Sequence, residues 1–266
     1  MTMTKVKFIL FLAAVIVLAT GCGRQQEGPS TSDSGGAGMG SLADVRGVEA
    51  AADSTIYGLA CDGCNDTIVV FLRLPYNGSD PDTLNILEAS HQHRVFGTPM
   101  IGDRLAIMRN SIDTTKADQM IVVEDLLGLW CYKVRPTLRQ RADMEGQSVS
   151  QSISQLPDSI RELLEVEREY GMTIKNDSVV YPHGMQWVAT TTDEETPIEY
   201  PRLKRYFVWY IHNGQLILTE TARDSLGNAY ATNIDTAAIA KLDNDTLVLR
   251  FADGEQSYYH KDETAD

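Results

Sequence analysis

Short apolar runs alternate with turn residues between positions 53 and 124, which predicts strands rather than long helices. The breaks between these runs are rich in Gly, Asn, Asp and Pro, the residues that tight turns require. This pattern predicts a small antiparallel β-domain over residues 44–125. The strands expected there are Thr55–Ala60, Thr67–Leu74, Thr83–Glu88, Arg104–Met108 and Gln119–Val123.

A second unit is expected from residue 126 onward, with one helix near residues 157–170. Pro157 and Asp158 are typical helix-start residues, an apolar face follows them, and Gly171 would end the helix. The strands expected in this unit are Met172–Lys175, Ser178–Tyr181, Tyr206–Ile211, Gln215–Thr219, Thr246–Phe251 and Gln256–His260.

The turns between these later strands predict consecutive hairpins. Asn213-Gly214 is the strongest turn signal, because both central positions of a type I′ turn need a positive φ. Consecutive hairpins favour an up-and-down barrel over residues 126–261, because closing the sheet removes its exposed edges. The expected fold class is all-β with one helix: a small β-barrel followed by a larger antiparallel one, then a disordered tail over residues 262–266.

The N-terminal 22 residues have the composition of a targeting segment. Lys5 and Lys7 precede an unbroken apolar run, Phe8–Ala19, and small residues lead from it to Cys22. About a dozen apolar residues are too few to cross a bilayer core, which takes about 20. The segment resembles a bacterial lipoprotein signal of the relaxed kind found in Bacteroidota. The resemblance implies removal of residues 1–21 and lipidation of Cys22; an ordinary secretory signal and an N-terminal anchor are the alternatives.

Residues 22–43 are expected to be a flexible tether, because they are rich in Gly and Ser and contain nothing that could nucleate a core. By the same resemblance, Gly23 after Cys22 argues against retention in an inner membrane. The expected location is therefore the outer membrane, on its periplasmic face or at the cell surface.

The acidic net charge of the chain argues against some classes of binding partner. The net charge is −14, and the loss of Lys5 and Lys7 with the signal would make it −16. Such a charge argues against nucleic acid and against electrostatic attachment to anionic lipid. The expected partners are the membrane, through a lipid on Cys22, and either a small apolar ligand or an envelope protein or glycan.

Cys61 and Cys64 form the sharpest cysteine motif. This spacing occurs in redox pairs, but such pairs open a helix and this one lies in an Asp-Gly turn between two expected strands. A zinc site would need a second pair of ligands. A structural disulfide is the leading interpretation; free thiols and redox or metal chemistry are the alternatives.

We find no nucleophile elbow, phosphate-binding loop or zinc-protease motif in the sequence. His91 and His93 are expected in a solvated loop, His183 is isolated, and Cys131 is expected to be a small core residue. The sequence therefore predicts no catalytic residues, metal ligands or cofactor, and a protein that is not an enzyme.

Aromatic and aliphatic side chains gather in the second unit, where alternate positions would face a barrel interior. They either fill this interior or line an apolar pocket for a small ligand. The candidate lining residues are Trp130, Trp187, Trp209, Tyr210, Leu216, Leu218, Leu247, Leu249 and Phe251.

Several of these residues carry a family resemblance. Gly128-Leu129-Trp130 resembles the Gly-x-Trp motif of lipocalins, and Trp209, Gln215–Leu218 and Asp245–Leu249 follow in the order found in lipocalin-like domains of Bacteroidota lipoproteins. The resemblance covers about residues 126–261 and implies a barrel able to hold a ligand. Residues 136–170 depart from it. In the first unit, the Gly102-Asp103 turn before an aliphatic strand resembles an OB-like domain.

The leading function hypothesis is a membrane-anchored extracytoplasmic lipoprotein that acts as a non-catalytic binding or envelope-structural module, with a small apolar ligand in the second barrel. One alternative is a protein- or glycan-interaction module that uses the OB-like domain. A second alternative is a thiol redox protein that uses Cys61 and Cys64.

Overall fold

The structure is a computed structural model that describes residues 52–139, 153–154, 156–185 and 198–262. These residues include the short helices α2 (Leu87–His91) and α4 (Asp158–Leu164) and the 3-10 turn η1 (Glu124–Leu126). Their strands form three sheets. In the described part of the chain, no helix is both long and apolar enough to cross a membrane. The expected signal, tether and lipidation site Cys22 lie outside these residues, as do Trp187 and all but the first residue of the expected tail.

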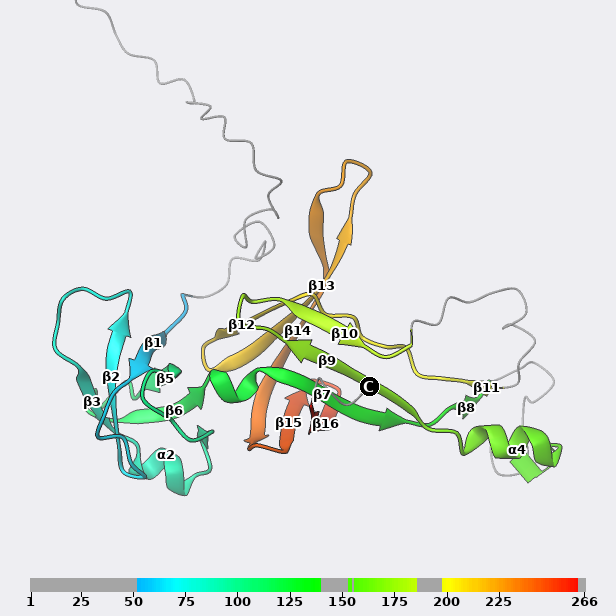
Figure 1. Cartoon of the computed structure of the whole chain (residues 1–266), viewed down its shortest axis with the longest axis horizontal. Coiled ribbons are helices and arrows are strands. Elements are labelled where there is room, and N and C mark those ends of the chain that lie inside the picture. Colours follow the sequence, from blue (N-terminus) through cyan, green and yellow to red (C-terminus); the bar gives the residue numbers. More distant parts are fainter. Residues whose placement is uncertain (1–51, 140–152, 155, 186–197, 263–266) are drawn as a thin grey trace, which may run out of the picture. The chain divides into compact units, whose positions relative to one another are not determined.

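The first sheet has six strands in the order β3-β2-β1-β5-β6-β4 (Figure 1). Its pairings are antiparallel except that β4 runs parallel to β6, and an isolated parallel bridge joins Asn85 at the end of β3 to Lys116 before β6. Phe71, Ile107 and Met120 are among the fully buried side chains of its core. The bounds are β1 Thr55–Ala60, β2 Ile68–Leu74, β3 Asp82–Asn85, β4 Val95–Phe96, β5 Arg104–Arg109 and β6 Ala117–Val122.

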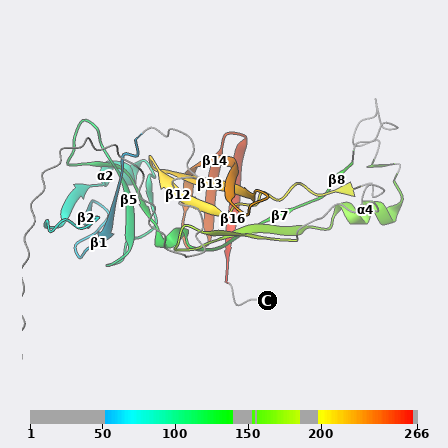
Figure 2. The ribbon, with the colours of Figure 1, turned by 90° about the horizontal axis from the view of Figure 1, so that it is seen from above.

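The second sheet has eight antiparallel strands in the order β10-β9-β7-β16-β15-β14-β13-β12 (Figure 1). Figure 2 shows its strands β7, β12, β13, β14 and β16 from above. An antiparallel bridge between Val179 and Val208 joins its two edges, so the sheet is a nearly closed barrel. The expected all-β fold with an antiparallel barrel is confirmed. The bounds are β7 Gly128–Val134, β9 Arg168–Ile174, β10 Val180–His183, β12 Val208–His212, β13 Gln215–Arg223, β14 Ala229–Leu242, β15 Thr246–Phe251 and β16 Gly254–Lys261.

A third sheet pairs β8 (Thr137–Leu138) with β11 (Ile198–Glu199). Several elements differ from the sequence prediction. The strand expected at Thr83–Glu88 ends at Asn85 and α2 begins at Leu87, and the short strands β4, β8 and β11 were not predicted. The helix ends at Leu164 instead of continuing to residue 170, because β9 begins at Arg168 and pairs with β7 along its whole length. The long strand β14 was not predicted; its N-terminal half is mostly exposed and forms the hairpin that extends past the neighbouring strands in Figure 1.

The turn expected at Asn213-Gly214 is present, with φ of 48° and 71°, as a type I′ hairpin requires. Gly128, which opens β7, has φ of 120°, and a Cβ there would lie 2.5 Å from the His260 ring. Glycine therefore lets that ring approach the strand. His260 stands edge-on to the buried indole of Trp130, which donates a 2.9 Å hydrogen bond to the carbonyl of Leu126.

One hydrophobic cluster contains buried side chains from both large sheets. Phe96, Ala106 and Ile121 of the first sheet belong to it together with most of the barrel interior. The barrel contributes Trp130, Met172, Ile174, Val180, Trp209, Ile211, Leu216, Leu218, Ala237, Ile239, Leu242, Leu247, Leu249 and Tyr258. The described side chains of this part of the barrel therefore pack against one another and against the first sheet.

Candidate functional site: a basic pocket at the barrel

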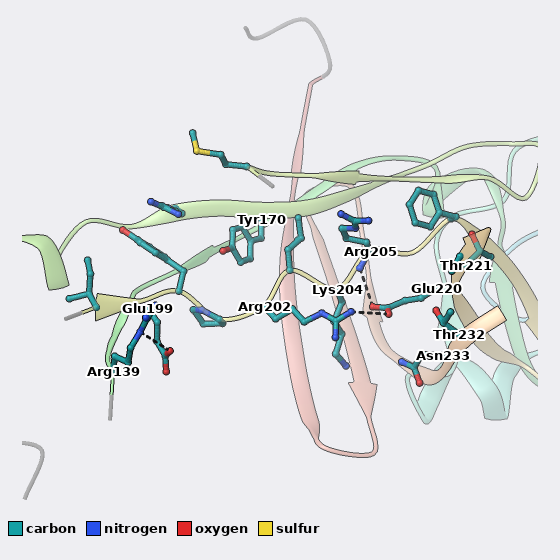
Figure 3. A pocket seen from close by; sticks show the side chains of 18 residues that line it. Arg139, Tyr170, Glu199, Arg202, Lys204, Arg205, Glu220, Thr221, Thr232 and Asn233 are labelled. Carbon is teal, nitrogen blue, oxygen red and sulfur yellow. Dashed lines mark hydrogen bonds and ion pairs between the residues drawn. The ribbon is translucent and has the colours of Figure 1, made fainter. Parts of the chain in front are cut away.

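A pocket of about 1170 Å³ lies between the barrel and the segment that leads from β11 to β12 (Figure 3). β9 contributes Tyr170, the connecting segment contributes Phe207, and β13 and β14 contribute Thr221 and Thr232. This volume is somewhat above the usual range for small-ligand pockets, about 300–1,000 Å³. The size and the mixed walls suit a small molecule.

Basic side chains are concentrated around this pocket, although the chain as a whole is acidic. Within the described part of the chain, five of the 23 Lys and Arg residues line it, together with the carboxylates of Glu199 and Glu220. The five are Arg139, Arg168, Arg202, Lys204 and Arg205. A concave surface lined with one sign of charge concentrates ligands of the opposite sign. The pocket therefore favours an anion.

Carboxylates lie close to three of the five cations, Arg139, Arg202 and Lys204. Arg202 lies 3.7 Å from Glu220, and because its own side chain is 88% exposed, solvent screens this long ion pair. Arg139 lies 3.6 Å from Glu199, and its buried Nε has no hydrogen-bond partner in the described part of the chain. A buried guanidinium nitrogen without a partner is costly, and an anionic ligand could supply that partner.

Apolar and aromatic surface lies beside the basic groups. The Arg168 guanidinium stacks over the ring of Tyr200 at 3.6 Å from its centroid. Tyr170 is buried, while Met185 is exposed at the rim. Aromatic walls with a few charged groups are typical of sites that orient a ligand by its polar end.

A buried polar pair fixes the segment that carries three of these cations. Tyr206 is 3% exposed and donates a hydrogen bond to the carboxylate of Asp235, which also accepts one from Lys204 at 3.1 Å. Burial raises the pKa of Tyr206, and Asp235 raises it further. Burial alone would raise the pKa of Asp235, but the hydrogen bonds from Tyr206 and Lys204 outweigh it and hold that pKa below its usual value.

Among the residues that the structure describes, none of the candidate lining residues from the sequence borders this pocket, and Trp187 lies outside them. Trp130, Trp209, Leu216, Leu218, Leu247 and Leu249 lie in the filled core, and Phe251 packs against it. Tyr210 borders a smaller recess of about 330 Å³ together with Tyr57. The basic residues were missed, although Arg202, Lys204 and Arg205 stand close together in an acidic sequence and were the available signal.

The structure places Cys61 and Cys64 in the turn between β1 and β2 as free thiols. Cys64 donates to the carbonyl of Val70 and accepts a hydrogen bond from its amide, both at 3.3 Å. No helix starts at this turn, contrary to what a redox motif would require. The disulfide between the two cysteines stays a prediction.

The outer face of the barrel holds a second polar cluster, around Glu169 on β9. Its carboxylate accepts hydrogen bonds from Tyr259 and, at 3.0 Å, from Lys261, and it lies 3.1 Å from His183 Nε2. The Tyr259 hydrogen bond, with those of Lys261 and His183, outweighs partial burial and lowers the pKa of Glu169 to about 2. No pattern in the sequence indicates this cluster, because strand pairing alone brings its members together. His91 and His93 are exposed, as expected of a solvated loop, although His91 ends α2.

Comparison with known proteins adds little. No family model matches the chain, and neither does any curated protein. A solved structure described as a lipocalin-like protein from Bacteroides thetaiotaomicron is similar to it at 18% identity, with a TM-score of 0.26, over 51% of this chain and 96% of that one. At such a TM-score the likeness carries no argument, so the fold described above rests on the strand order and pairing.

Proposed function

We propose that this protein is a non-catalytic binding module that holds a small amphipathic anion, such as a carboxylate or sulfonate with an apolar body, in the pocket beside its barrel. The single observation that carries the proposal is the gathering of five cations around one pocket of a chain with net charge −14. Charge-assisted hydrogen bonds from Arg to an oxyanion are about twice as strong as neutral ones. The aromatic walls would bind the apolar body.

The proposal modifies the ligand expected from the sequence, which was a purely apolar one in the barrel interior. That interior is occupied by side chains such as Trp209 and Leu218. The pocket that is open to a ligand has a charged entrance, and an anion would form charge-assisted hydrogen bonds there that an uncharged ligand cannot form.

We extend the proposal to the wider architecture. The barrel is lipocalin-like, supported by its up-and-down strand order and by the buried Trp130 after Gly128. The first sheet is OB-like, supported by the meander β1-β2-β3, the pairing of β1 with β5, and the parallel bridge from β3 toward β6. Anchoring through a lipid on Cys22 in the outer membrane completes the proposal and is supported by the sequence of residues 1–22.

The test compares two fluorescent probes of nearly the same shape, anilinonaphthalene sulfonate and the uncharged phenyl naphthylamine. We expect the sulfonate to bind the full chain more tightly, and its affinity to fall as salt is added. The double variant Arg202→Gln/Arg205→Gln should weaken the sulfonate about tenfold, and the uncharged probe much less.

The matched control neutralises two cations that lie away from the pocket, in the variant Arg94→Gln/Lys241→Gln. It changes the net charge by the same amount and should leave the affinity for the sulfonate within about twofold. Equal loss in both double variants, or tighter binding of the uncharged probe to the natural protein, would contradict the proposal. The interaction-module and thiol-redox alternatives stay predictions.

A further inference from the structure

Three side chains of the kinds that bind metal ions converge on the outer face of the barrel. Cys131, Glu169 and His183 each offer a ligand atom, and these three atoms lie within 4.8 Å of one another. They come from three adjacent strands, with β9 between β7 and β10 (Figure 1). Trp130 and Met172 face the core, so the alternation of side chains places Cys131 and Gly171 on the outer face.

Strand register explains the convergence. Cys131 on β7 and His183 on β10 both pair with Gly171 on β9, one from each side. Glu169 precedes Gly171 by two residues and therefore shares its face. Because glycine has no side chain, the thiol and the imidazole can approach each other above it.

The gap above Gly171 is a fixed property of the fold. A Cβ at this position would lie 2.3 Å from the carbonyl oxygen of Trp130 on the neighbouring strand. No other residue fits there without moving the backbone, so the space between Cys131 and His183 cannot be filled from below.

We propose that Cys131, Glu169 and His183 form a binding site for a divalent transition-metal ion, with Zn²⁺ the best match. Zinc takes thiolate, imidazole and carboxylate ligands, and tetrahedral zinc keeps its ligand atoms about 3.3–3.6 Å apart. His183 Nε2 already lies 3.1 Å from Glu169 Oε1. The upper limit of 4.8 Å for the set means that small side-chain rotations suffice. Three protein ligands leave a fourth position for water.

An ammonium group of the protein itself lies at the position that a metal ion would take beside Glu169. The Lys261 ammonium lies 3.0 Å from Glu169 Oε1, where a metal ion would bind. Tyr259 donates to the other carboxylate oxygen and would keep orienting it. Cys131 is fully buried, while the side chains of Glu169 and His183 are 30% and 28% exposed, so the ion enters from their side.

Binding of the metal ion displaces a proton and an ammonium group from the site. The Cys131 thiol releases its proton to solvent as the metal–sulfur bond forms, and the Lys261 ammonium leaves the carboxylate for water. No electron is transferred. Because the metal competes with this proton, its affinity rises with pH.

Cobalt(II) provides a direct test, since a cobalt–thiolate bond has a charge-transfer absorption band in the near ultraviolet. We expect the reduced full chain to develop this band, to saturate at one equivalent, and to lose it when Zn²⁺ is added. The variant Cys61→Ser/Cys64→Ser should behave identically, because those thiols belong to another turn. Cys131→Ser, which nearly preserves side-chain size, should abolish the band.

Variants of the other positions separate the roles. His183→Gln should weaken cobalt binding by about tenfold or more, whereas His212→Gln should not change it. Lys261→Met should tighten binding by removing the competing ammonium. Circular dichroism confirms that each variant is folded. A band that survives Cys131→Ser or disappears in Cys61→Ser/Cys64→Ser would overturn the proposal, and so would a folded natural protein without any band.

Discussion

The hydroxyl group of Tyr57 donates a 2.6 Å hydrogen bond to the backbone carbonyl of Ile211, 154 residues later in the chain. Tyr57 belongs to β1 of the first sheet and Ile211 to β12 of the barrel. Nearby, the Gln119 side chain donates a 2.6 Å hydrogen bond to the carbonyl of Gly214. These bonds lie beside the hydrophobic cluster that the two sheets share, so we expect the two sheets to unfold together.

Replacing Tyr57 with Phe should lower the free energy of unfolding by about 1 kcal/mol, because the carbonyl of Ile211 loses its donor. Urea unfolding followed by tryptophan fluorescence measures the effect. Because no tryptophan lies in the first sheet, the fluorescence reports the unfolding of the barrel. Tyr76→Phe is the control, since that side chain is 61% exposed. A fluorescence transition unchanged in Tyr57→Phe would show that the barrel unfolds independently.

The carboxylate of Asp235 should make stability depend on acidity. Because its pKa is lowered in the folded state, its contribution is present above its unfolded pKa, near 4, and is lost as the pH falls through the lower folded value. Asp235→Asn should cost about 1.5 kcal/mol at neutral pH, and the difference from the natural protein should shrink below about pH 4. Urea unfolding across a pH series tests this.

Asp253→Asn provides the comparison for that series. Asp253 lies 3.7 Å from the same Lys204 ammonium, but its side chain is 74% exposed. The free energy of unfolding of Asp253→Asn should change with pH in parallel with that of the natural protein. If the free energy of unfolding of Asp235→Asn also changed with pH in parallel with that of the natural protein, the hydrogen bond from Tyr206 to Asp235 would not be the source of the pH dependence.

Glu220 should oppose anion binding in the pocket. Its carboxylate pairs with Arg202 at 3.7 Å and accepts a hydrogen bond from the backbone amide of Arg205 at 3.2 Å. Glu220→Gln should raise the affinity for anilinonaphthalene sulfonate by about twofold to fivefold, the range expected from a long ion pair whose Arg202 side is exposed to solvent. Fluorescence titration measures it, and Glu255→Gln, away from the pocket, should have no effect.

The seam that closes the barrel should be its weakest line. Between β10 and β12 run the bridge at Val179, hydrogen bonds of 3.0 Å at Val180 and Trp209, and a 2.8 Å bond from the Trp209 indole to the carbonyl of Lys175. Trp209→Phe removes the indole bond and should cost about 1–3 kcal/mol. The amide of Val180, whose acceptor lies across the seam, should then exchange its hydrogen faster.

Hydrogen exchange measured by NMR tests that expectation, with Tyr181→Phe as the control because Tyr181 lies on β10 with half of its side chain exposed. An unchanged exchange rate at Val180 in Trp209→Phe would show that the bridge and backbone bonds alone hold the barrel closed.

The sequence predicted the strands best where turn residues and alternation agree. Thr55–Ala60 and Thr246–Phe251 match β1 and β15 residue for residue, and Asn213-Gly214 forms the expected turn. The sequence did not predict β14, because apolar and polar residues do not alternate clearly in its exposed half. It also failed after Leu164, where helix-like spacing continued but pairing with β7 imposed a strand.

The candidate sites were harder to predict because their residues are distant in sequence. Arg139 and Thr232 meet in one pocket only through the closure of the barrel, and Cys131 and His183 meet only because both pair with Gly171. Trp130 and Leu218, which alternation places inside the barrel, belong to the buried cluster. Alternation could not say whether side chains would fill that interior, since this depends on how all the inward residues pack together.

The position of β16 between β7 and β15 has a consequence for biosynthesis. The earliest strand of the barrel finds one of its two neighbours only in Gly254–Lys261, near the far end of the polypeptide. A ribosome-bound chain that still lacks β16 therefore presents β7 and β15 as open edges, to which a second nascent copy could add.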